Sequence, residues 1–409
     1  MTMMDSKSDR RLRVTIVGGG STAHTLIPLL SGAGHSVSIL TRRPNEWSRE
    51  VESQYQSVHG EVLGVYKGRL DTASDNPSRV IPQADVIILC MPVSKYRIAL
   101  HQIAPHIDPT RKVRIGTIYG QGGFNWMVEE IKRKFDLKHV GYFAVGLVPW
   151  ICRTIEFGKT GVMYGFKEVN LVAVSPRDDF ELLNHLILND ISERWFQKGA
   201  FRPVSNFLSL TLSVDNQIIH PTRYYGLFIR YGGQWSSAKE IPYFYRDYDE
   251  LSADLLRQAD RDYTVIRDAI KSRYPHWNFE YMLDYLALER LSYNWAITDI
   301  RETIVSSTSL GAIQTPVIQS ASGGWVIDIN HRFFTDDIYY GICIAKWMAE
   351  KMDLDVPCID RILNWAQKIR GERIVQDGKL VPDSESLTKE FNSGIPSVYG
   401  FRSIDDIVD

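Results

Sequence analysis

The chain has 409 residues, of which 44% are hydrophobic and 23% are charged, and its formal net charge is −2. This length exceeds what one hydrophobic core usually supports, so we expect two domains. The nearly neutral charge lacks the basic excess that nucleic-acid or anionic-membrane binding favours, and no apolar run approaches the roughly 20 residues of a membrane span. The composition therefore indicates a globular protein without nucleic-acid or membrane partners.

Cysteine usage and the first residues favour a reducing compartment. The four cysteines, Cys90, Cys152, Cys343 and Cys358, are far apart and form no C-x-x-C pair, so we expect neither a metal site nor a disulfide framework. The first twelve residues, "MTMMDSKSDRRL", are polar and lack the apolar core of a signal peptide. We therefore expect a cytoplasmic protein with reduced cysteines.

The first half of the chain alternates between short β-rich runs and helical stretches. After "LRVTIV" comes the helical "TAHTLIPLLSG", and the later runs are "SVSILT", "DVIILC", "KVRIGTI", "HVGYFAV" and "VNLVAVS". Such alternation predicts a mostly parallel sheet covered by helices. From about residue 200, apolar residues recur at helical spacing over 248–272, 277–297, 337–352 and 358–370. We expect an α/β domain at 1–198 and an all-helical domain at 199–409.

A glycine-rich turn follows the first expected strand. "VTIVGGGSTAH" places Gly18, Gly20 and Ala23 in a G-x-G-x-x-A array that ends a strand and opens a helix at Ser21. Gly18 permits the tight turn, Gly20 lets backbone N–H groups approach a pyrophosphate, and the small Ala23 allows close helix–strand packing. In this context the four residues predict a dinucleotide site in a Rossmann-type domain.

The end of the second expected strand indicates which dinucleotide binds. "SILTRRPNEW" offers Thr41, Arg42 and Arg43 where NAD sites commonly carry an acidic residue. Guanidinium groups pair with phosphate oxygens, so this stretch favours the 2′-phosphate of NADPH over NADH, although a solvated charge pair on a surface turn is the alternative. Met91 and Pro92 end the strand of "DVIILCMP" and are expected in the same crevice.

His220 precedes Pro221 in "DNQIIHPTRYYG" and follows an apolar run typical of a helix. Because proline disfavours the α conformation of the residue before it, we expect this helix to stop near His220 and to leave the imidazole accessible. From this segment alone two interpretations stay open: the ring hydrogen-bonds a carbonyl at a packed corner, or it moves protons.

Several motifs in order along the chain resemble the octopine/nopaline dehydrogenase (opine dehydrogenase) family. They are "LVPWICRTIEFG", the His-Pro of "IIHPTRYYG", "IPYFYRDYDELSADLL", "INHRFFTDDIYYG", "RILNWAQKIRGE" and "YGFRSIDDI". The resemblance implies a Rossmann domain, a helical domain and an active site in the cleft between them. It also implies a reaction in which an amino acid and an α-keto acid condense to an imine, which NAD(P)H reduces to an N-(carboxyalkyl)amino acid.

The resemblance implies roles for four residues. His220 corresponds to the catalytic acid/base, Asp337 to the carboxylate that holds it, Arg332 to a carboxylate binder and Arg290 to a second substrate-binding arginine. The chemistry agrees, because histidine titrates nearest neutral pH, a carboxylate fixes its tautomer, and arginine forks match carboxylates.

Local sequence leaves alternatives for two of these four. Thr335 resembles an N-cap, which would place Asp336 and Asp337 in a helix's first turn, where acids are favoured anyway. Arg290 follows Glu289 and could belong to a surface ion pair.

One departure from the family bears on the substrate. Gly146 in "AVGLVPW" stands where the resemblance places an acidic residue in arginine-using molluscan enzymes. This argues against octopine as the product, unless another acid replaces it, and leaves the amino acid open. The keto acid is expected to be pyruvate-like, with 2-oxoglutarate also possible.

Two other readings of the chain stay open. One is a keto-acid reductase of the ketopantoate reductase type, although no lysine is placed like His220; the other is a non-catalytic NADPH-binding homologue. The sequence is compatible with a monomer or a homodimer.

Overall fold

The middle of the large sheet is built from short apolar runs. The computed structural model describes residues 11–321, 323–381 and 393–408. The strands of the sheet are β1 Arg13–Val17, β2 Ser36–Leu40, β3 Glu50–Gln56, β4 Val62–Ser74, β5 Val86–Leu89, β6 Val113–Thr117, β7 Val140–Val145, β8 Ile151–Glu156, β9 Thr160–Tyr164, β10 Val169–Ser175 and β11 Ala200–Pro203. Their order is β11-β10-β7-β6-β5-β1-β2-β4-β3-β9-β8. All six strands expected from the sequence are present, and the five from β7 to β2 are parallel to one another, whereas β10 is antiparallel to β7.

The central strands are buried on both faces because the sheet separates two hydrophobic cores. Side chains alternate along β5, so Ile87 and Leu89 join one core while Val86 and Ile88 join the other. The first core includes α2 Tyr96–Ile103 and α3 Phe124–Phe135 and continues into the helical half of the chain. The second includes α1 Ser21–Gly32, and near it lie α4 Phe180–Leu183 and α5 Glu193–Phe196. This arrangement confirms the expected α/β domain.

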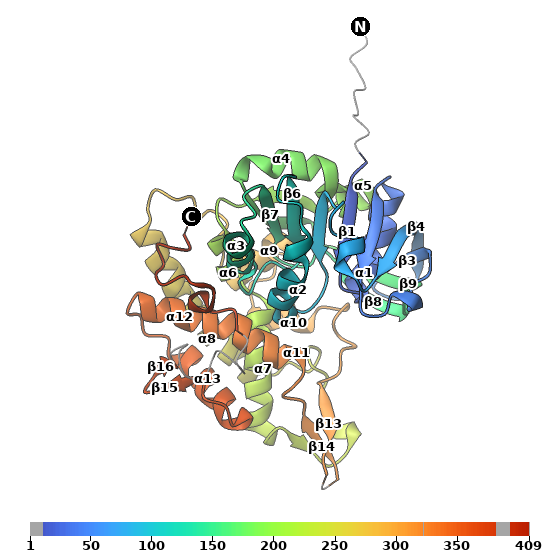
Figure 1. Ribbon diagram of the computed structural model, residues 1–409. Coiled ribbons are helices and arrows are strands. Elements are labelled where there is room, and N and C mark those ends of the chain that lie inside the picture. The colour runs from blue at the N-terminus through green and yellow to red at the C-terminus, as the bar shows by residue number, and fades with distance from the viewer. Residues whose placement is uncertain (1–10, 322, 382–392, 409) are drawn as a thin grey trace.

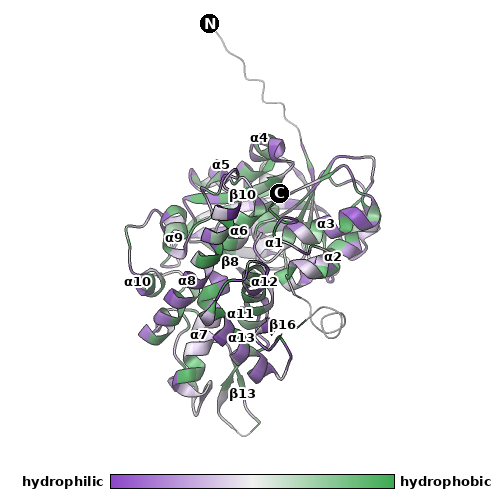
Figure 2. Cartoon of the chain, turned by 90° about the vertical axis from the view of Figure 1, so that its left-hand side faces the viewer, coloured by the Kyte–Doolittle hydropathy of each residue, from purple (hydrophilic) through white to green (hydrophobic). Residues whose placement is uncertain are grey.

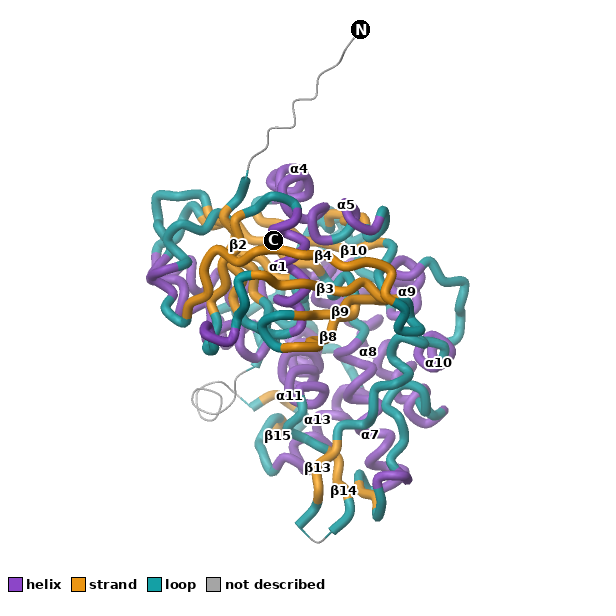
Figure 3. The backbone as a smooth tube through the Cα atoms, turned by 90° about the vertical axis from the view of Figure 1, so that its right-hand side faces the viewer, coloured by secondary structure: helices purple, strands orange, loops and turns teal. Residues whose placement is uncertain are grey.

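Four strands that the sequence did not predict extend the sheet past β2. The long strand β4 pairs in parallel with β2 and antiparallel with β3, and β3 in turn pairs with β9. Figure 3 shows β4, β3, β9 and β8 in succession. All four contact α1, so this part of the sheet curls around that helix.

The second half is mainly helical, as expected, and lies beside the lower edge of the sheet in Figure 1. Its helices are α6 Phe207–Leu212, α7 Asn216–Tyr231, α8 Glu250–Arg273, α9 Tyr285–Tyr293, α10 Ile300–Val305, α11 Arg332–Asp337, α12 Cys343–Lys351 and α13 Pro357–Arg370. Small strands accompany them: β12 Gln234–Trp235, β13 Val317–Gln319, β14 Trp325–Ile327, β15 Val375–Gln376 and β16 Lys379–Leu380. Figure 2 shows hydrophilic residues along α8 and α13 and hydrophobic residues along α6.

Three helix boundaries differ from the expectation. The chain breaks at 213–215 instead of at His220, and α7 then runs through Pro221. Asp215 caps the start of α7, so Pro221 falls in the second turn, where its missing N–H removes only one early hydrogen bond. The helix expected over 277–297 is confined to α9, because Asp284 caps its start and Asn294 ends it with a left-handed conformation.

The third difference concerns Thr335, which is not an N-cap. α11 begins earlier, at Arg332, and the side chain of His331 caps it by accepting a hydrogen bond from the Phe333 N–H. Asp336 and Asp337 therefore lie in the last turn of α11, and a π-helical segment, Ile338–Ile342, follows them. Because the helical backbone continues through this segment into α12, Asp336 and Asp337 lie past the first turn of a longer helix, where the helix dipole does not account for them.

Among the described residues, no helix is both long and apolar enough to cross a membrane. All four cysteines are buried with free thiols.

Candidate active site

The glycine turn forms an anion-binding helix start. Gly18 has φ +105°, and a Cβ on it would lie 2.6 Å from the Cys90 carbonyl oxygen, so only glycine fits. Gly20 is the N-cap of α1, no side chain caps the helix, and its first turn holds no acidic residue. Ala23 is fully buried against the sheet. The first N–H groups of α1 are thus left without a side-chain acceptor, as a pyrophosphate requires.

The other expected cofactor residues surround this turn. A Cβ on Gly19 would lie 2.9 Å from the Thr41 hydroxyl oxygen, and one on Gly18 would lie 3.1 Å from the Met91 methyl. Pro92, which follows Met91, is exposed. The Ser21 hydroxyl lies 3.1 Å from that of Thr154 on β8. Residues distant in sequence therefore meet at the carboxyl ends of β1, β2 and β5, where open α/β sheets bind ligands.

Arg42 and Arg43 are both exposed at the end of β2, but their surroundings differ. The Arg43 guanidinium pairs with Glu46 at 3.1 Å and stacks 3.6 Å from the centre of the Phe157 ring. Arg42 has no ion pair or hydrogen bond from its side chain within the described part of the chain. Arg42 is therefore the arginine of the two whose charge is available to a ligand.

His220 and Asp337 are direct partners. The Nδ1 of His220, on α7, lies 2.6 Å from Oδ2 of Asp337, on α11, and both side chains are buried. The other ring nitrogen, Nε2, lies 2.6 Å from the hydroxyl of Tyr245. Phe333 stacks on the imidazole, with the ring centres 3.9 Å apart. The ring is thereby fixed on both edges and on one face.

Tyr245 was missed by the sequence analysis. It lies in the loop before α8, inside the motif "IPYFYRDYDELSADLL", among tyrosines and a phenylalanine that the sequence alone does not distinguish. That motif of the family resemblance was the signal that could have pointed to it.

Electrostatics favour a neutral imidazole. Burial, assisted by the positive charge of Arg332, lowers the pKa of His220 to about 3. Burial also raises the pKa of Tyr245 far above its usual value, so its hydroxyl keeps its proton. The assignment that fits both is a Tyr245 O–H that donates to Nε2 and an Nδ1–H that donates to Asp337. Nε2 is then a poised proton acceptor.

Arg332 lies near the His220–Asp337 pair, and its positive charge is available to a ligand. Its side chain is exposed, contacts the Phe333 ring, and forms no ion pair with any residue that the structure describes. Its charge lowers the pKa of His220 and opposes the burial that raises that of Asp337. A cation in this position suits the carboxylate of a substrate.

The π-helical segment sets the distance between α7 and α11. A Cβ on Gly341 would lie 2.8 Å from the Cβ of Gln217, one turn before His220. The Gln217 side chain donates to the Tyr340 carbonyl at 2.9 Å. π-helical turns interrupt the regular backbone pattern and are frequent at functional sites. Here the turn brings the helix that carries Asp337 close to the helix that carries His220.

Asp336 links this pair to the cofactor side. Its carboxylate is hydrogen-bonded to Ser94, two residues after Pro92, and is buried. Burial and the adjacent Asp337 raise the pKa of Asp336 to about 6. The neighbour of Asp337 in sequence therefore contacts the segment that follows β5.

Arg290 is placed differently. It is exposed on α9, where its Nε donates to the Ile297 carbonyl at 3.2 Å. Within the described ranges no contact links it to His220, Asp337 or Arg332. It does not pair with Glu289 either, because that side chain is buried.

The described residues contain no group of three or more His, Cys, Asp or Glu side chains suited to a metal ion.

Each half of the chain matches a known protein family. Residues 203–370 match the family "NAD/NADP octopine/nopaline dehydrogenase, alpha-helical domain", and residues 13–115 match "NADP oxidoreductase coenzyme F420-dependent". Octopine dehydrogenase of Mizuhopecten yessoensis is 26% identical over 411 residues, which cover 97% of this chain and 98% of that protein. Residues 203–370 thus match the helical domain of the octopine/nopaline dehydrogenase family, and the similarity to an octopine dehydrogenase extends over nearly the whole chain.

Other relatives extend over the same length. Tauropine dehydrogenase of Arabella iricolor is 24% identical, with 97% of this chain and 99% of that protein covered. The solved structure of an octopine dehydrogenase with NADH and L-arginine has a TM-score of 0.79 at 24% identity, and it covers 97% of this chain and 98% of its own. The two-domain fold of the family is thus present throughout, and a nicotinamide cofactor is its coenzyme.

Proposed function

We propose that the protein is an NADPH-dependent opine dehydrogenase. The amine of an amino acid and the ketone of a pyruvate-like α-keto acid condense to an imine with loss of water, and hydride transfer reduces this imine to an N-(carboxyalkyl)amino acid. The observation that carries the proposal is His220, held between Asp337 and Tyr245 with the Arg332 charge beside it. An acid/base next to a carboxylate binder is the equipment that joining an amine to a keto acid requires.

His220 moves the protons in this mechanism. Its neutral Nε2 accepts a proton from the incoming ammonium, which frees the amine to attack the ketone, and the resulting imidazolium returns a proton to the departing water. Asp337 holds Nδ1–H and stabilises the imidazolium that forms. Tyr245 leaves Nε2 when the amine arrives, because both cannot occupy the same lone pair.

Arg332 binds the keto-acid carboxylate in this proposal. The interaction orients the ketone toward His220, and the exposed guanidinium requires no existing ion pair to break. Arg290 as a second carboxylate binder stays a prediction, and its place on the outside of α9 does not support it.

The residues at the glycine turn fit the cofactor. The uncapped start of α1 suits the pyrophosphate, and the proposed contacts are Gly18, Gly20, Ser21, Ala23, Thr41, Met91 and Pro92. When bound, NADPH supplies the hydride that reduces the imine. The uncommitted guanidinium of Arg42 supports NADPH rather than NADH, with Arg43 packed beside it on Phe157.

We place the domain division between residues 198 and 199, next to the last strand of the sheet, β11. We also propose that the protein acts in the cytoplasm, as a monomer or homodimer.

The test is NADPH oxidation by the purified protein with a mixture of α-keto acids, with and without a pool of amino acids, followed by mass spectrometry. Oxidation that requires both pools and yields a secondary amine of condensed mass is expected. Oxidation with keto acids alone would establish a carbonyl reductase of the ketopantoate type instead. A protein that binds NADPH without oxidising it under any condition would be the non-catalytic homologue.

A variant separates catalysis from binding. His220→Gln is expected to abolish turnover while NADPH binding, followed by fluorescence, persists. His101→Gln is the matched control, because His101 pairs with Glu130 in the sheet domain. Equal activity of His220→Gln and wild type would overturn the proposed role.

A further inference from the structure

The product of the proposed reaction carries two carboxylates, and only one of them has a cation assigned to it. An N-(carboxyalkyl)amino acid keeps the carboxylate of the keto acid, which the proposal assigns to Arg332, and also the carboxylate of the amino donor. Arginine matches a carboxylate best, because its planar fork donates two parallel hydrogen bonds. Three cations of the described residues can be compared for the second role: Arg290, Lys167 and Arg153.

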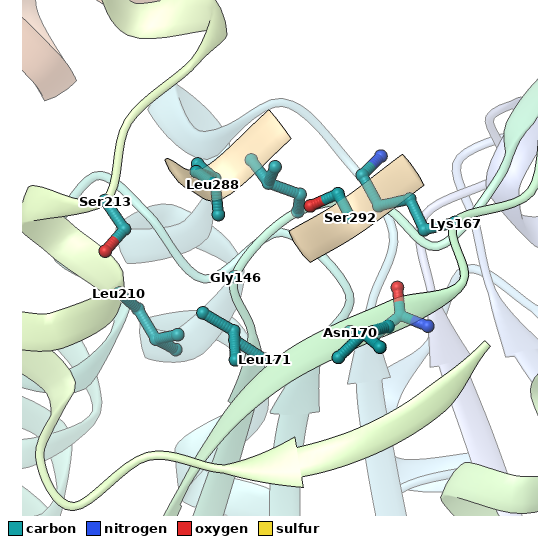
Figure 4. A pocket seen from close by; sticks show the side chains of 10 residues that line it. Gly146, Lys167, Asn170, Leu171, Leu210, Ser213, Leu288 and Ser292 are labelled. Atoms are coloured by element: carbon teal, nitrogen blue, oxygen red, sulfur yellow. The ribbon is translucent and has the colours of Figure 1, made fainter. Parts of the chain in front are cut away.

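Neither Arg290 nor Lys167 is suited to this role. Arg290 is exposed on α9, where its Nε donates to the Ile297 carbonyl at 3.2 Å. Lys167 lines the cavity beside Gly146 (Figure 4), whose volume of about 10 Å³ admits about one water. The Lys167 ammonium donates to the Val148 carbonyl at 2.8 Å, and the side chain is buried. This cavity therefore has no room for a carboxylate.

Arg153 lies on β8, the strand at one end of the sheet. Its neighbours in sequence face the start of α1: the Thr154 hydroxyl lies 3.1 Å from that of Ser21, and the Cys152 Sγ lies 3.8 Å from the Thr22 hydroxyl. Because side chains alternate along a strand, Arg153 projects from the opposite face of β8, and it is exposed. The motif "LVPWICRTIEFG" thus places a cation next to the glycine turn.

Contacts connect this end of the sheet to the loop that carries Tyr245. A Cβ on Gly165, which follows β9, would lie 3.1 Å from the Ile151 side chain on β8 and 3.3 Å from the Ser309 hydroxyl oxygen in the helical half. The carbonyl four residues after Ser309 accepts a hydrogen bond from the Phe244 N–H at 2.9 Å. In Figure 3, β8 is the strand of the large sheet drawn nearest α11. β8 therefore adjoins the segment that contacts the proposed acid/base.

The positive charges of Arg153 and Arg332 act on the same groups. Burial raises the pKa of Tyr245, and both arginines oppose that rise. Burial likewise raises the pKa of the Cys152 thiol, which both arginines also oppose. Since salt screens the interactions of exposed charges beyond roughly 10 Å, the two guanidinium groups lie around one region. That region includes the hydroxyl that contacts Nε2 of His220.

Neither arginine has an acidic partner within the part of the chain that the structure describes. The Arg153 Nη1 donates to the carbonyl of the adjacent Cys152 at 2.7 Å, and the Arg332 guanidinium contacts the Phe333 ring. Two cations in one region repel each other, and a ligand with two negative charges relieves that repulsion. The arrangement therefore suits a dicarboxylate.

We propose that Arg153 binds the α-carboxylate of the amino donor, while Arg332 binds the carboxylate of the keto acid. The two substrates are then anchored by different domains, and the amine and the ketone meet between them, beside His220. Condensation joins the two halves into a product that both arginines hold. This inference rests on the proposed function and adds a substrate-binding residue to it.

The first test is the kinetics of Arg153→Leu with pyruvate and each of the twenty common L-amino acids. KM for the fastest donor is expected to rise about 10- to 100-fold, the size of a charge-assisted pair, while KM for pyruvate changes little. Arg153→Lys, which keeps the charge without the fork, should fall between wild type and Arg153→Leu. Arg69→Leu, an exposed arginine on β4 of the same sheet, is the matched control and should change neither KM. An unchanged KM for the donor, or an equal rise in both KM values, would overturn the inference.

Calorimetry separates this inference from the proposed function. N-(1-carboxyethyl)-L-alanine carries two carboxylates and N-ethyl-L-alanine carries one, and each is titrated into the protein with NADP⁺ present. Wild type is expected to bind the first about tenfold or more tightly than the second, and Arg153→Leu to remove most of that difference. This result without turnover of any donor would sustain the role of Arg153 and refute the opine dehydrogenase activity. No difference between the two compounds, or a difference that persists in Arg153→Leu, would refute the role of Arg153 even where donors are turned over.

Discussion

The hydroxyl of Tyr245 and the Nε2 of His220 lie 2.6 Å apart, on the opposite side of the imidazole from Asp337. The proton-accepting nitrogen is therefore covered by a donor that never ionises in the working range, because burial raises the pKa of Tyr245. An O–H that donates to Nε2 stabilises the neutral ring and keeps it from being protonated before a substrate arrives. Tyr245 thus acts on the reaction through His220, as a positioning residue.

Tyr245→Phe is expected to change the pH profile of opine oxidation. In that direction His220 must accept a proton, so activity falls as pH drops through the pKa of His220. Removal of the donated hydrogen bond, worth about 1 kcal/mol, raises this pKa and shifts the acid limb of kcat/KM toward higher pH by about 0.7 unit. Tyr231→Phe, on the same helix as His220 but at the surface, is the control. An unshifted acid limb would mean that the hydroxyl does not donate to Nε2.

Replacement of Arg332 by leucine should weaken keto-acid binding selectively. The loss of a charge-assisted pair with the carboxylate, about 1.5–3 kcal/mol, is expected to raise KM for pyruvate about 10- to 100-fold. Arg290→Leu is the informative comparison, because its guanidinium lies at the surface of α9. Steady-state kinetics with each substrate varied in turn will show which arginine matters. A larger KM effect from Arg290→Leu would assign the keto-acid carboxylate to Arg290 and contradict the proposed role of Arg332.

Arg42→Ala should reduce the preference for NADPH over NADH. The loss of one guanidinium–phosphate contact is expected to raise KM for NADPH by about tenfold or more and to leave KM for NADH nearly unchanged, because NADH has no 2′-phosphate. Arg49→Ala, another exposed arginine in the same region, controls for loss of general positive charge. If the variant affects both coenzymes equally, Arg42 does not contact the 2′-phosphate.

The sequence predicted the sheet core well because parallel strands buried on both faces read as continuous apolar runs, as in "DVIILC". It failed on β3 and β4, whose polar, half-exposed side chains alternate weakly and whose pairing depends on the distant α1. Local propensity contains no information about that contact.

The candidate site, like the sheet, was predicted from the sequence only in part. His220 and Asp337 were found through a family resemblance, and the sequence misplaced both relative to their helices. The break at 213–215 was hidden inside an apolar run, and Thr335 matched the N-cap preference although His331 holds that position. Tyr245 was not identified, because its importance comes from its contact with a group far away in the chain.

Gly341→Ala should disturb the site without touching any reacting group. The new Cβ would lie 2.8 Å from the Cβ of Gln217, so α7 and the π-helical segment must move apart, at a cost of about 1–3 kcal/mol for overpacking. Since that segment follows Asp337 directly, the separation lengthens the 2.6 Å contact with His220. We expect a lower melting temperature and a kcat reduced about tenfold or more, since misplacement of catalytic groups by about 1 Å is costly.

The control for this variant is Gly311→Ala, whose Cβ would meet no atom closer than 3.5 Å. It should leave both the melting temperature and kcat near their wild-type values. Loss of stability in Gly341→Ala with kcat intact would show that the spacing of α7 and α11 tolerates the added methyl group, and that the dyad geometry does not depend on the π-helical turn.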